Sequence, residues 1–392
     1  MFKTPITVAS SLSRRVLRRE TGKPPLFLFG FNDWKTFVQD WFPDRRVIFT
    51  PMNLWPVEFA IEWRWKLLAD RRAEVLCWQY KGPPGLSEFC KRNRIPFQYV
   101  EDGFIRSVSL GAMRSSPISL TFDRQDMYFN AGVPTDLEDL LASYDFDKDH
   151  DLMQRSKSAI ARVLNSGLSK YNAGISVDVE EIYGPKTRKR ILVVGQVERD
   201  ASIQFGSDKR YNNNDAVWIA RRENPDAQII YKPHPEVLAG TAEATSDPNA
   251  VRGIATVLDK NISLADSFRT IDQVYTITSL SGFEALLRGI KVTTLGCPFY
   301  SGWGLTDDRQ ANPRRTRKLT IEQIFAAAYI LYPKYFDPVA KEYVDVETAL
   351  NILQDMRSGM PAPGDIPAVT VNPVEELAAA IARHLRSNRV RI

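Results

Sequence analysis

The sequence predicts an α/β protein with two domains, each a parallel sheet covered by helices, that face each other across a cleft. The chain has 392 residues, which exceeds the usual domain length of about 100–200 residues. Short apolar runs alternate with amphipathic stretches in both halves, as is typical of parallel strands joined by crossover helices. With 44% hydrophobic and 11% aromatic residues, the chain has enough apolar side chains for two buried cores.

The first domain is expected at residues 26–187, after a basic arm formed by residues 1–25. Its strands are expected at 26–29, 47–49, 74–78 and 97–100. Stretches rich in charge and tryptophan, such as 57–72, separate these runs and are predicted to be crossover helices of a parallel sheet. The polar stretch 135–183 is predicted to be mostly helical.

The second domain is expected at residues 188–357, where the alternation is more regular. Its strands are expected at 191–194, 229–231, 274–278 and 291–295, with helices at 215–223 and 281–288. Ligands of open α/β sheets bind at the carboxyl ends of the strands. Two such Rossmann-like units facing each other across a cleft form the GT-B arrangement of nucleotide-sugar transferases, so we expect a GT-B-like fold.

The two ends of the chain are basic. Residues 358–392 are expected to form a Pro/Gly linker and an amphipathic helix, which either packs on the body or lies on the inner face of a membrane. The arm carries Arg14, Arg15, Arg18 and Arg19 without the apolar region of a secretory signal. No stretch approaches the roughly 20 apolar residues of a membrane span. We therefore expect a cytoplasmic protein, at most peripheral on the inner membrane.

Charge and cysteine content exclude several classes of function. The net charge of +5 suits anionic substrates or an anionic membrane surface, but it is too weak to indicate nucleic-acid binding. Three scattered cysteines form neither a disulfide framework nor a zinc site, and no metal is expected. The chain has no Walker loop, no dinucleotide-type glycine fingerprint and no Gly-x-Ser-x-Gly elbow, which argues against phosphoryl hydrolysis and serine hydrolase chemistry.

The segment YKPHP, residues 231–235, is the strongest local signal. The strand must end at Lys232, because Pro233 cannot donate to a ladder. His234, held between two prolines, is expected to project at the carboxyl end of the strand, where imidazole can contact a phosphate or leaving group. Lys232 can add a point charge to the same phosphate. The alternative is a packed core histidine.

The segment TSLSGFE, residues 278–284, joins a strand to a helix. Ser279 and Ser281 are candidate N-caps, and Gly282 permits close approach to the backbone N–H groups of an anion site. Glu284, one turn later, can accept hydrogen bonds from ribose hydroxyls. A capping box of Ser281 with Glu284 is the alternative, and it is compatible with nucleotide binding.

The segment GQVERDAS, residues 195–202, follows a buried strand and suits a loop at the cleft. It includes Gln196, two carboxylates, Glu198 and Asp200, and Ser202. Either carboxylate can serve as a nucleophile or base, or the segment can be a solvated loop. The residues alone do not choose among these alternatives.

Two further segments are expected to reach the cleft. In EDGFIRS, residues 101–107, Glu101 and Asp102 can orient sugar hydroxyls and Arg106 can pair with a substrate carboxylate, unless Arg106 forms an internal ion pair with Asp102. In PFYSGWGLTD, residues 298–307, a glycine-rich aromatic loop with Tyr300 and Trp303 can lie over a base or ribose, or can be a packed turn.

Taken together, and in this order, these segments resemble the β-Kdo transferases of capsule biosynthesis, the KpsC-type family. The matching stretches are EDGFIRS, GQVERDAS, YKPHP, TSLSGFEALLRG, PFYSGWGLTDD and the later YPKYFDP. The resemblance lies between residues 101 and 338 and is loose or absent outside them. It implies a GT-B-like fold and transfer of Kdo, an acidic eight-carbon sugar, from CMP-β-Kdo with retention of configuration.

The resemblance also implies roles for individual residues. Family members are thought to use double displacement, and by its position Asp200 corresponds to the nucleophile. His234 would assist departure of CMP, with Lys232 beside the phosphate and Ser279, Ser281, Gly282 and Glu284 around phosphate and ribose. Gln196, Tyr300 and Trp303 would complete the donor side, and Glu101, Asp102, Arg106 and Ser202 the sugar and acceptor side. No cofactor or metal is expected, because CMP is a good leaving group.

Several alternatives remain at this level. Arg199 stands beside the expected nucleophile where relatives tend to have an acidic residue, which leaves a change of substrate open. A sialyltransferase-like enzyme, a CDP-glycerol-dependent transferase, or a non-catalytic assembly or export component are the rival functions. The expected partners are a nucleotide sugar and a glycan or glycolipid acceptor, with contact to polysaccharide-assembly proteins also open. Family members often carry two such modules in tandem, so the single module here implies one linkage type.

Overall fold

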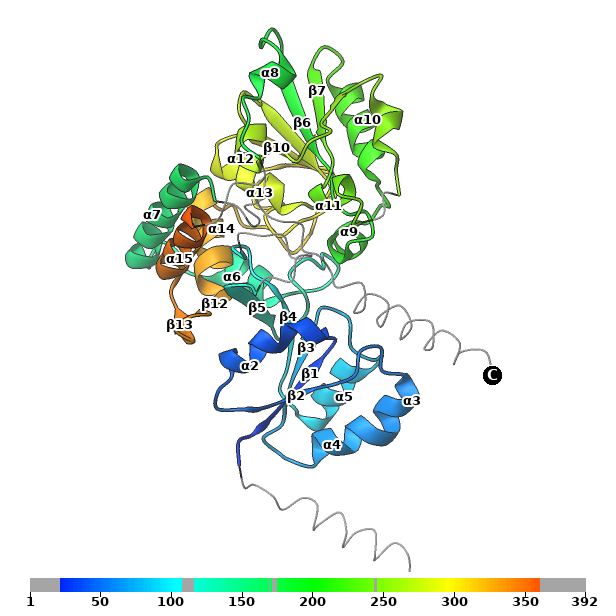
Figure 1. Ribbon diagram of the computed structural model, residues 1–392, viewed down its shortest axis with the longest axis vertical. Helices are drawn as coiled ribbons and strands as arrows, with labels where there is room; N and C mark the ends of the chain where they lie inside the picture. Colours follow the sequence, from blue (N-terminus) through cyan, green and yellow to red (C-terminus); the bar gives the residue numbers. More distant parts are fainter. Residues whose placement is uncertain (1–21, 108–115, 169, 171–174, 243–244, 360–392) are drawn as a thin grey trace, which may run out of the picture.

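The computed structural model describes residues 22–107, 116–168, 170, 175–242 and 245–359. It has two α/β lobes, one above the other in Figure 1, each built on its own sheet. The predicted fold class is thereby confirmed. The expected linker and helix at 358–392 and most of the basic arm lie outside the described residues. Among the described residues, no helix has the length and apolar content needed to cross a membrane.

The first lobe contains a mixed sheet of seven strands. In space their order is β13-β12-β5-β4-β3-β1-β2. The strands are β1 (Pro25–Phe29), β2 (Arg46–Phe49), β3 (Glu74–Trp78), β4 (Phe97–Asp102), β5 (Ser119–Asp123), β12 (Pro333–Asp337) and β13 (Glu342–Val344). The four strands β1 to β4 are parallel as predicted, whereas β5, β12 and β13 pair antiparallel. The prediction of a wholly parallel first sheet was therefore wrong at this edge.

The chain returns to the first lobe near its end. Strand β12 pairs with β5, with Lys334 opposite Leu120 and Tyr335 opposite Ser119. Residues 333–344, expected within the second domain, therefore belong to the first sheet. The division of the chain at residue 187 does not anticipate this return, because strand pairing joins segments that are far apart in sequence.

Helices cover both faces of the first sheet. Successive side chains along each strand point alternately to one face and to the other. Phe27 and Phe29 of β1 pack under the π-helical turn η2 (Phe59–Trp63), which follows α3 (Pro56–Glu58), and under α4 (Arg64–Leu68) and α5 (Leu86–Asn93). Leu26 and Leu28 face the opposite side, where η1 (Asp33–Phe37) leads into α2 (Val38–Trp41). Figure 1 shows α3 and α5 on one side of β1 and α2 on the other.

The second lobe contains a wholly parallel sheet of six strands, in the order β11-β10-β9-β6-β7-β8. The strands are β6 (Arg190–Val194), β7 (Gln228–Lys232), β8 (Thr256–Val257), β9 (Gln273–Thr276), β10 (Lys291–Thr294) and β11 (Asp307–Asp308). The intervening helices are α9 (Ala201–Gly206), α10 (Asn213–Glu223), α11 (Pro235–Leu238), η4 (Pro248–Val251), α12 (Leu264–Ser267) and α13 (Leu280–Leu287).

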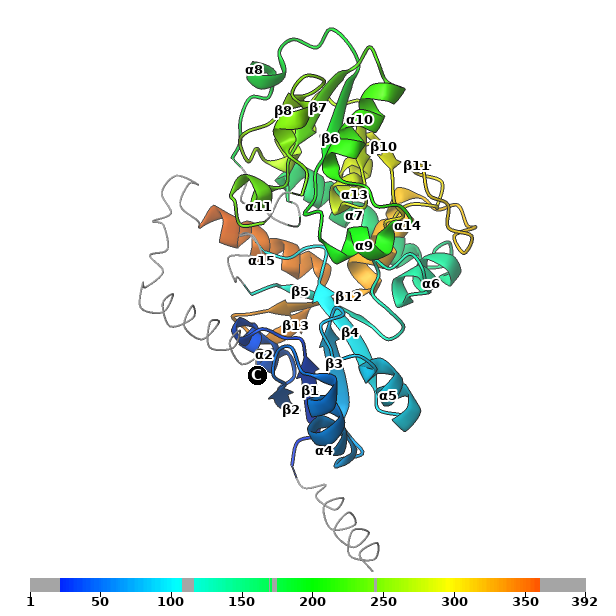
Figure 2. The same cartoon turned by 90° about the vertical axis from the view of Figure 1, so that its right-hand side faces the viewer.

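A third group of helices joins the lobes. It comprises α6 (Asp136–Ser143), α7 (His150–Ser166), α14 (Ile321–Phe325), η5 (Ala326–Leu331) and α15 (Val346–Ser358), whereas α8 (Glu180–Tyr183) lies at the far end of the second lobe in Figure 1. Figures 1 and 2 both show α15 at the level between the two sheets. One hydrophobic core contains Phe104 of the first lobe, Leu192 and Phe283 of the second, and Leu350 of α15. The lobes are therefore fixed to each other by a shared core.

Candidate functional site

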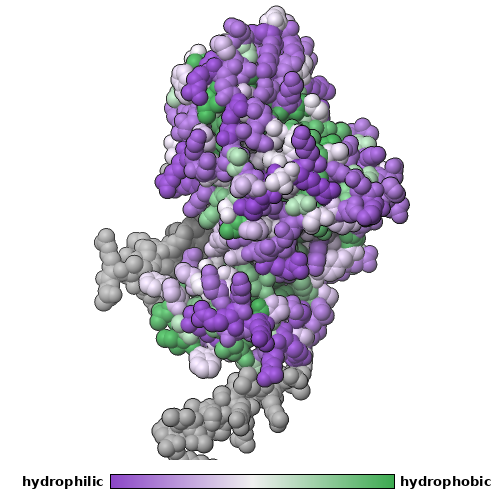
Figure 3. Space-filling view, turned by 180° about the vertical axis from the view of Figure 1, so that it is seen from behind, coloured by the Kyte–Doolittle hydropathy of each residue, from purple (hydrophilic) through white to green (hydrophobic). Residues whose placement is uncertain are grey.

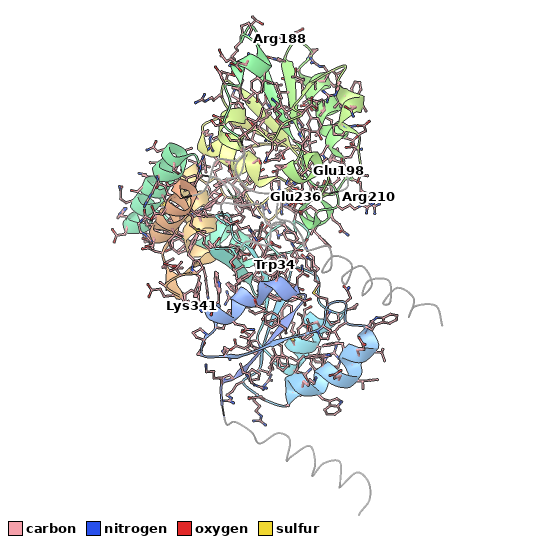
Figure 4. The ribbon with its side chains drawn as sticks, in the orientation of Figure 1. Trp34, Arg188, Glu198, Arg210, Glu236 and Lys341 are labelled. Atoms are coloured by element: carbon pink, nitrogen blue, oxygen red, sulfur yellow. The ribbon has the colours of Figure 1, made fainter. Side chains whose placement is uncertain are left out.

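A cavity of about 540 Å³ lies between the lobes and is lined by residues of both. Its second-lobe wall is formed by the loops after β6, β7 and β9, and its first-lobe wall by residues at the end of β4 and in η1. In Figure 4, Trp34 lies at the top of the first lobe and Glu236 at the facing side of the second. Of the predicted site residues, eleven line the cavity: Glu101, Asp102, Arg106, Gln196, Asp200, Ser202, Lys232, His234, Ser279, Ser281 and Glu284.

The structure separates the two carboxylates of the loop after β6. Asp200 is exposed, lines the cavity and caps α9, its Oδ1 accepting a hydrogen bond from Ser202 N–H at 2.7 Å. Glu198 does not line the cavity: it accepts hydrogen bonds from the N–H groups of Asn213 (2.7 Å) and Ser246 (2.8 Å) and from the Ser246 hydroxyl. Burial alone would raise the pKa of Glu198, but these hydrogen bonds outweigh it and hold that pKa below its ordinary value. Glu198 therefore fixes the loop through hydrogen bonds, and Asp200 is the carboxylate of this loop that lines the cavity.

Gln196 and Ser202 fix the loop that carries Asp200. The side-chain amide of Gln196 donates to Thr278 Oγ1 at 3.1 Å, and its carbonyl accepts from Thr278 N–H at 2.8 Å. Ser202 Oγ lies 3.4 Å from the same Thr278 Oγ1. These contacts tie the loop after β6 to the loop after β9, so the side chains that line the cavity are held in register.

His234 follows β7 at the N-cap of α11. Its Nδ1 accepts a hydrogen bond from Glu236 N–H at 3.2 Å, so in the neutral imidazole the proton lies on Nε2. Burial lowers the pKa of His234 to about 4, although the charge of Asp200 acts in the opposite direction. The residue is thus a neutral hydrogen-bond donor at physiological pH, which suits contact with a phosphate.

Lys232 is buried beside His234. Its ammonium donates to the carbonyl of Ile262 at 2.5 Å, and burial lowers its pKa to about 8. A cation in this position remains mostly charged at neutral pH. An anionic group in the cavity would stabilise it further.

Ser279, and not Ser281, is the N-cap of α13, since its Oγ accepts a hydrogen bond from Ser281 N–H at 3.2 Å. Glu284 takes no part in capping. Its Oε1 accepts from Lys170 N–H at 3.2 Å, and its buried Oε2 has no hydrogen-bond partner among the described residues. Burial raises the pKa of Glu284 to about 7. A buried carboxylate oxygen without a partner at a cavity wall indicates a ligand hydroxyl.

The first-lobe wall carries the ion pair that was considered from sequence. Arg106 Nε donates to Asp102 Oδ2 at 2.6 Å, while the buried Oδ1 of Asp102 has no partner among the described residues. Glu101 accepts from Asp102 N–H and from the Gln79 amide, and burial followed by the nearby Asp102 raises its pKa. Arg106 therefore pairs with one carboxylate oxygen of Asp102, and the other oxygen stays without a partner among the described residues.

Lys35 completes this wall and was missed in the sequence analysis. It is only 5% exposed and lines the cavity. Among the described residues its ammonium has no hydrogen-bond or ion-pair partner and lies over the Trp78 ring. Burial lowers its pKa to about 7, against the attraction of Asp102 and Glu101. The sequence signal for Lys35 was its position just after β1. Because β1 and β4 are parallel, their carboxyl ends lie at the same edge of the sheet.

Glu236 was also missed. It lines the cavity from the first turn of α11, and burial, then the charge of Asp200, raises its pKa. The sequence signal was its place two residues after His234, at the same strand end.

Three predicted donor-side residues do not reach the cavity. Tyr300 and Trp303 are fully buried; Tyr300 donates to the carbonyl of Ser279, and Trp303 Nε1 donates to that of Phe299 at 2.8 Å. The alternative of a packed turn thus describes their loop. Gly282 is required by packing, since a Cβ there would lie 2.1 Å from the Tyr300 hydroxyl. Tyr300 and Gly282 therefore support the start of α13, which carries the cavity-lining Ser279 and Ser281.

No group of three or more His, Cys, Asp or Glu side chains that could hold a metal ion occurs among the described residues. The three cysteines, Cys77, Cys90 and Cys297, are buried and free.

A family model and two curated proteins match this chain, and their names all refer to capsule polysaccharide or lipopolysaccharide. Residues 73–335 match the family model described as capsule polysaccharide biosynthesis protein. The chain is 41% identical over 345 residues to the lipopolysaccharide-processing protein LpsZ of Rhizobium meliloti, covering 86% of this chain and 76% of LpsZ. It is also 41% identical over 292 residues to the capsule polysaccharide modification protein LipA of Neisseria meningitidis serogroup A, covering 74% of this chain but 40% of LipA. The chain thus spans about two fifths of the length of LipA.

Two solved structures from Thermosulfurimonas dismutans KpsC superpose on the chain. The β-Kdo 2,4 transferase gives a TM-score of 0.73 at 30% identity, covering 85% of this chain and 99% of that chain. The β-Kdo 2,7 transferase gives a TM-score of 0.66 at 29% identity, with the same coverage.

Proposed function

Because the chain belongs to the capsule polysaccharide biosynthesis protein family, we propose that it is a retaining glycosyltransferase that moves Kdo from CMP-β-Kdo to a glycan or glycolipid acceptor. One observation carries the proposal. A single cavity brings the exposed Asp200 together with His234, Lys232 and the unpartnered oxygens of Glu284 and Asp102. The similarity to two β-Kdo transferases supports the choice of sugar.

The second-lobe wall offers groups that fit CMP. The Nε2–H of His234 and the ammonium of Lys232 supply a hydrogen bond and a positive charge for the phosphate. Glu284 Oε2 can accept a hydrogen bond from ribose hydroxyls, which would relieve the cost of leaving this oxygen buried without a partner.

The first displacement would use Asp200. An Asp200 carboxylate oxygen attacks C2 of Kdo, the bond between C2 and the phosphate oxygen breaks, and its electron pair leaves with CMP. His234 and Lys232 stabilise the negative charge that develops on the phosphate. The product of this step is a covalent Kdo ester on Asp200.

The second displacement would involve the first-lobe wall. An acceptor hydroxyl attacks C2, the ester bond to Asp200 breaks, and the hydroxyl proton passes to a carboxylate such as Asp102 through its free Oδ1. Two inversions at C2 give overall retention. Lys35, without a polar partner among the described residues, can hold an anionic or hydroxyl group of the substrate next to Asp102.

Intact-protein mass spectrometry after incubation with CMP-β-Kdo tests the mechanism. Wild-type protein should gain the mass of one Kdo residue, and Asp200→Ala should not. Asp208→Ala removes a neighbouring exposed carboxylate and serves as the matched control that keeps the mass gain. If Asp200→Ala still transferred Kdo to an acceptor at the wild-type rate, Asp200 would lose its role as the nucleophile.

Donor choice separates the rival functions. The same incubation with CMP-sialic acid should leave the protein unmodified, whereas a sialyltransferase-like enzyme would use it. A non-catalytic assembly component would bind neither CMP nor CMP-Kdo. Titration with CMP alone distinguishes that outcome from a donor mismatch.

A further inference from the structure

The helical segment 56–68, formed by α3, η2 and α4, has two opposite apolar faces. Phe59, Trp63 and Leu67 recur every four residues and are buried against the first sheet. Residues two positions earlier in each turn lie on the opposite side of a helix. An ordinary surface helix is polar on that side.

This outer face is instead apolar. Trp55, Val57, Ile61 and Trp65 are 59%, 57%, 70% and 68% exposed, respectively. From Val57 to Trp65 the stripe runs over about 12 Å, since a helix rises about 1.5 Å per residue. Single exposed apolar residues need no explanation, but a contiguous stripe with two tryptophans indicates a binding surface. Figure 3, which views the molecule from behind, shows apolar colour at the lower left, on the first lobe. We call these four residues the tryptophan stripe.

The surroundings of the stripe are basic. Residues 55–72 and the neighbouring 86–94 together carry seven basic and four acidic side chains. Arg64, between Ile61 and Trp65, is exposed, as are Lys91 and Arg92 at the end of α5. Two of the four acidic side chains are engaged within this helical segment: Glu62 pairs with Lys66 at 2.6 Å, and Glu58 accepts the Trp55 N–H at 3.1 Å.

Gly22, the first described residue, lies beside the loop that follows the same helix. Arg72, four residues after the end of α4, donates to the carbonyl of Gly22 at 3.3 Å. Residues 1–21 contain five basic side chains and one acidic side chain. The sequence that precedes the first described residue is therefore also basic.

From this juxtaposition we propose that the tryptophan stripe is a docking surface for an anionic lipid bilayer. Tryptophan side chains favour the boundary between headgroups and acyl chains, where an amphipathic ring is apolar on one part and polar on another. Basic residues beside them attract anionic headgroups, and this attraction falls with distance and with salt. The inference goes beyond the proposed function, because it assigns a surface remote from the cavity-lining residues.

Flotation with lipid vesicles, using the full chain and no sugar donor, tests the proposal. Wild-type protein should bind vesicles containing phosphatidylglycerol, should bind phosphatidylcholine vesicles far more weakly, and should dissociate as salt is raised. The double variant Ile61→Glu/Trp65→Glu should weaken binding by at least about tenfold, because two charges would enter the interface. Trp218→Glu on α10 of the second lobe is the matched control, since Trp218 is 53% exposed and should tolerate the same change.

Other occupants of the stripe give different results. Equal vesicle binding by wild-type protein and the double variant would overturn the proposal. So would a wild-type dimer that the double variant converts to a monomer without a change in lipid binding, because the stripe would then be a contact between two copies. Thermal unfolding and CMP binding of the double variant verify that it is folded. Since neither lipid binding nor these controls require sugar transfer, failure of the docking surface and failure of the proposed enzymatic activity are distinguishable.

Discussion

At the scale of single residues, the cavity contains charged atoms whose burial does not stabilise the fold. Lys35 has its ammonium over an aromatic ring without a polar partner among the described residues, and one oxygen each of Asp102 and Glu284 is buried without a hydrogen bond there. Burying such groups costs free energy unless a ligand completes their contacts. The cavity is therefore built at the expense of stability, as functional sites often are.

Replacing Lys35 with methionine should raise stability and lower activity. The pKa of Lys35 is lowered from 10.5 in the unfolded chain to about 7 in the fold. The destabilisation is therefore complete below pH 7 and disappears as the pH rises toward 10.5. Thermal unfolding of Lys35→Met should show a gain in melting temperature that is largest at neutral pH and below.

The same variant should slow Kdo transfer on the order of 100-fold, as expected for loss of a positioning group. CMP affinity should stay unchanged, because Lys35 lies on the first-lobe wall. Lys148→Met, at an exposed lysine, is the control for both measurements. Unchanged transfer by Lys35→Met would remove Lys35 from the acceptor side.

Site residues could be predicted where the neighbouring sequence marks them, and could not be predicted where contacts with distant residues decide their role. The cavity lining was identified for residues at or just after the ends of buried strands, such as Lys232, His234 and Ser279. The family resemblance pointed to Asp200, but the residues alone could not choose between Glu198 and Asp200. That choice depends on hydrogen bonds from Asn213 and Ser246, which are distant in sequence. Lys35 was missed because a single lysine in a turn is ordinary until folding buries it.

At the scale of secondary structure elements, the position of α13 is fixed by a close contact between Gly282 and Tyr300, which lies in the loop after β10. Alanine at Gly282 would place a methyl group 2.1 Å from the Tyr300 hydroxyl. Because both residues are fully surrounded, Gly282→Ala should lower the free energy of unfolding by about 1–3 kcal/mol. It should also weaken CMP binding, since Ser279 and Glu284 would shift with the helix.

A double-mutant cycle in chemical denaturation measures this contact. Tyr300→Phe removes the hydroxyl and should recover part of the loss in the Gly282→Ala background. Gly289→Ala, just after the same helix, is unsuitable as a control because Gly289 has a positive φ of 72°. Ala285→Gly, within α13, adds no volume and measures the combined loss of a buried methyl group and of helix propensity. Additive effects of Gly282→Ala and Tyr300→Phe would contradict the contact.

Element by element, periodicity located the parallel strands β1, β3, β6 and β10 to within a residue or two. It did not identify β5 or the antiparallel hairpin β12–β13. The pairing of β12 with β5 joins partners more than two hundred residues apart, such as Tyr335 and Ser119, and a local pattern has no information about such partners.

At the scale of the whole molecule, the late hairpin stabilises the first lobe. Phe336 of β12 is buried and stacks on Trp41 of α2, with ring centroids 5.0 Å apart. Phe336→Ala should lower the free energy of unfolding by about 3–5 kcal/mol. Hydrogen exchange should show that protection is lost in β1 to β5, although the substitution lies in the second half of the sequence.

Val339→Ala in the same hairpin is the control, because Val339 is 89% exposed and should have little effect. Since one core spans both lobes, the second lobe should unfold in the same transition. Loss of protection confined to either one of the two sheets would contradict this arrangement.

The return of the chain to its first sheet also constrains how such a gene can be rearranged. A recombination breakpoint between residues 188 and 332 would separate β12 and β13 from the sheet that they complete. Each half would then be inherited with an open sheet edge, which invites aggregation. Duplications and fusions that survive selection should therefore copy the stretch from β1 through α15 as one unit, with their junctions outside it.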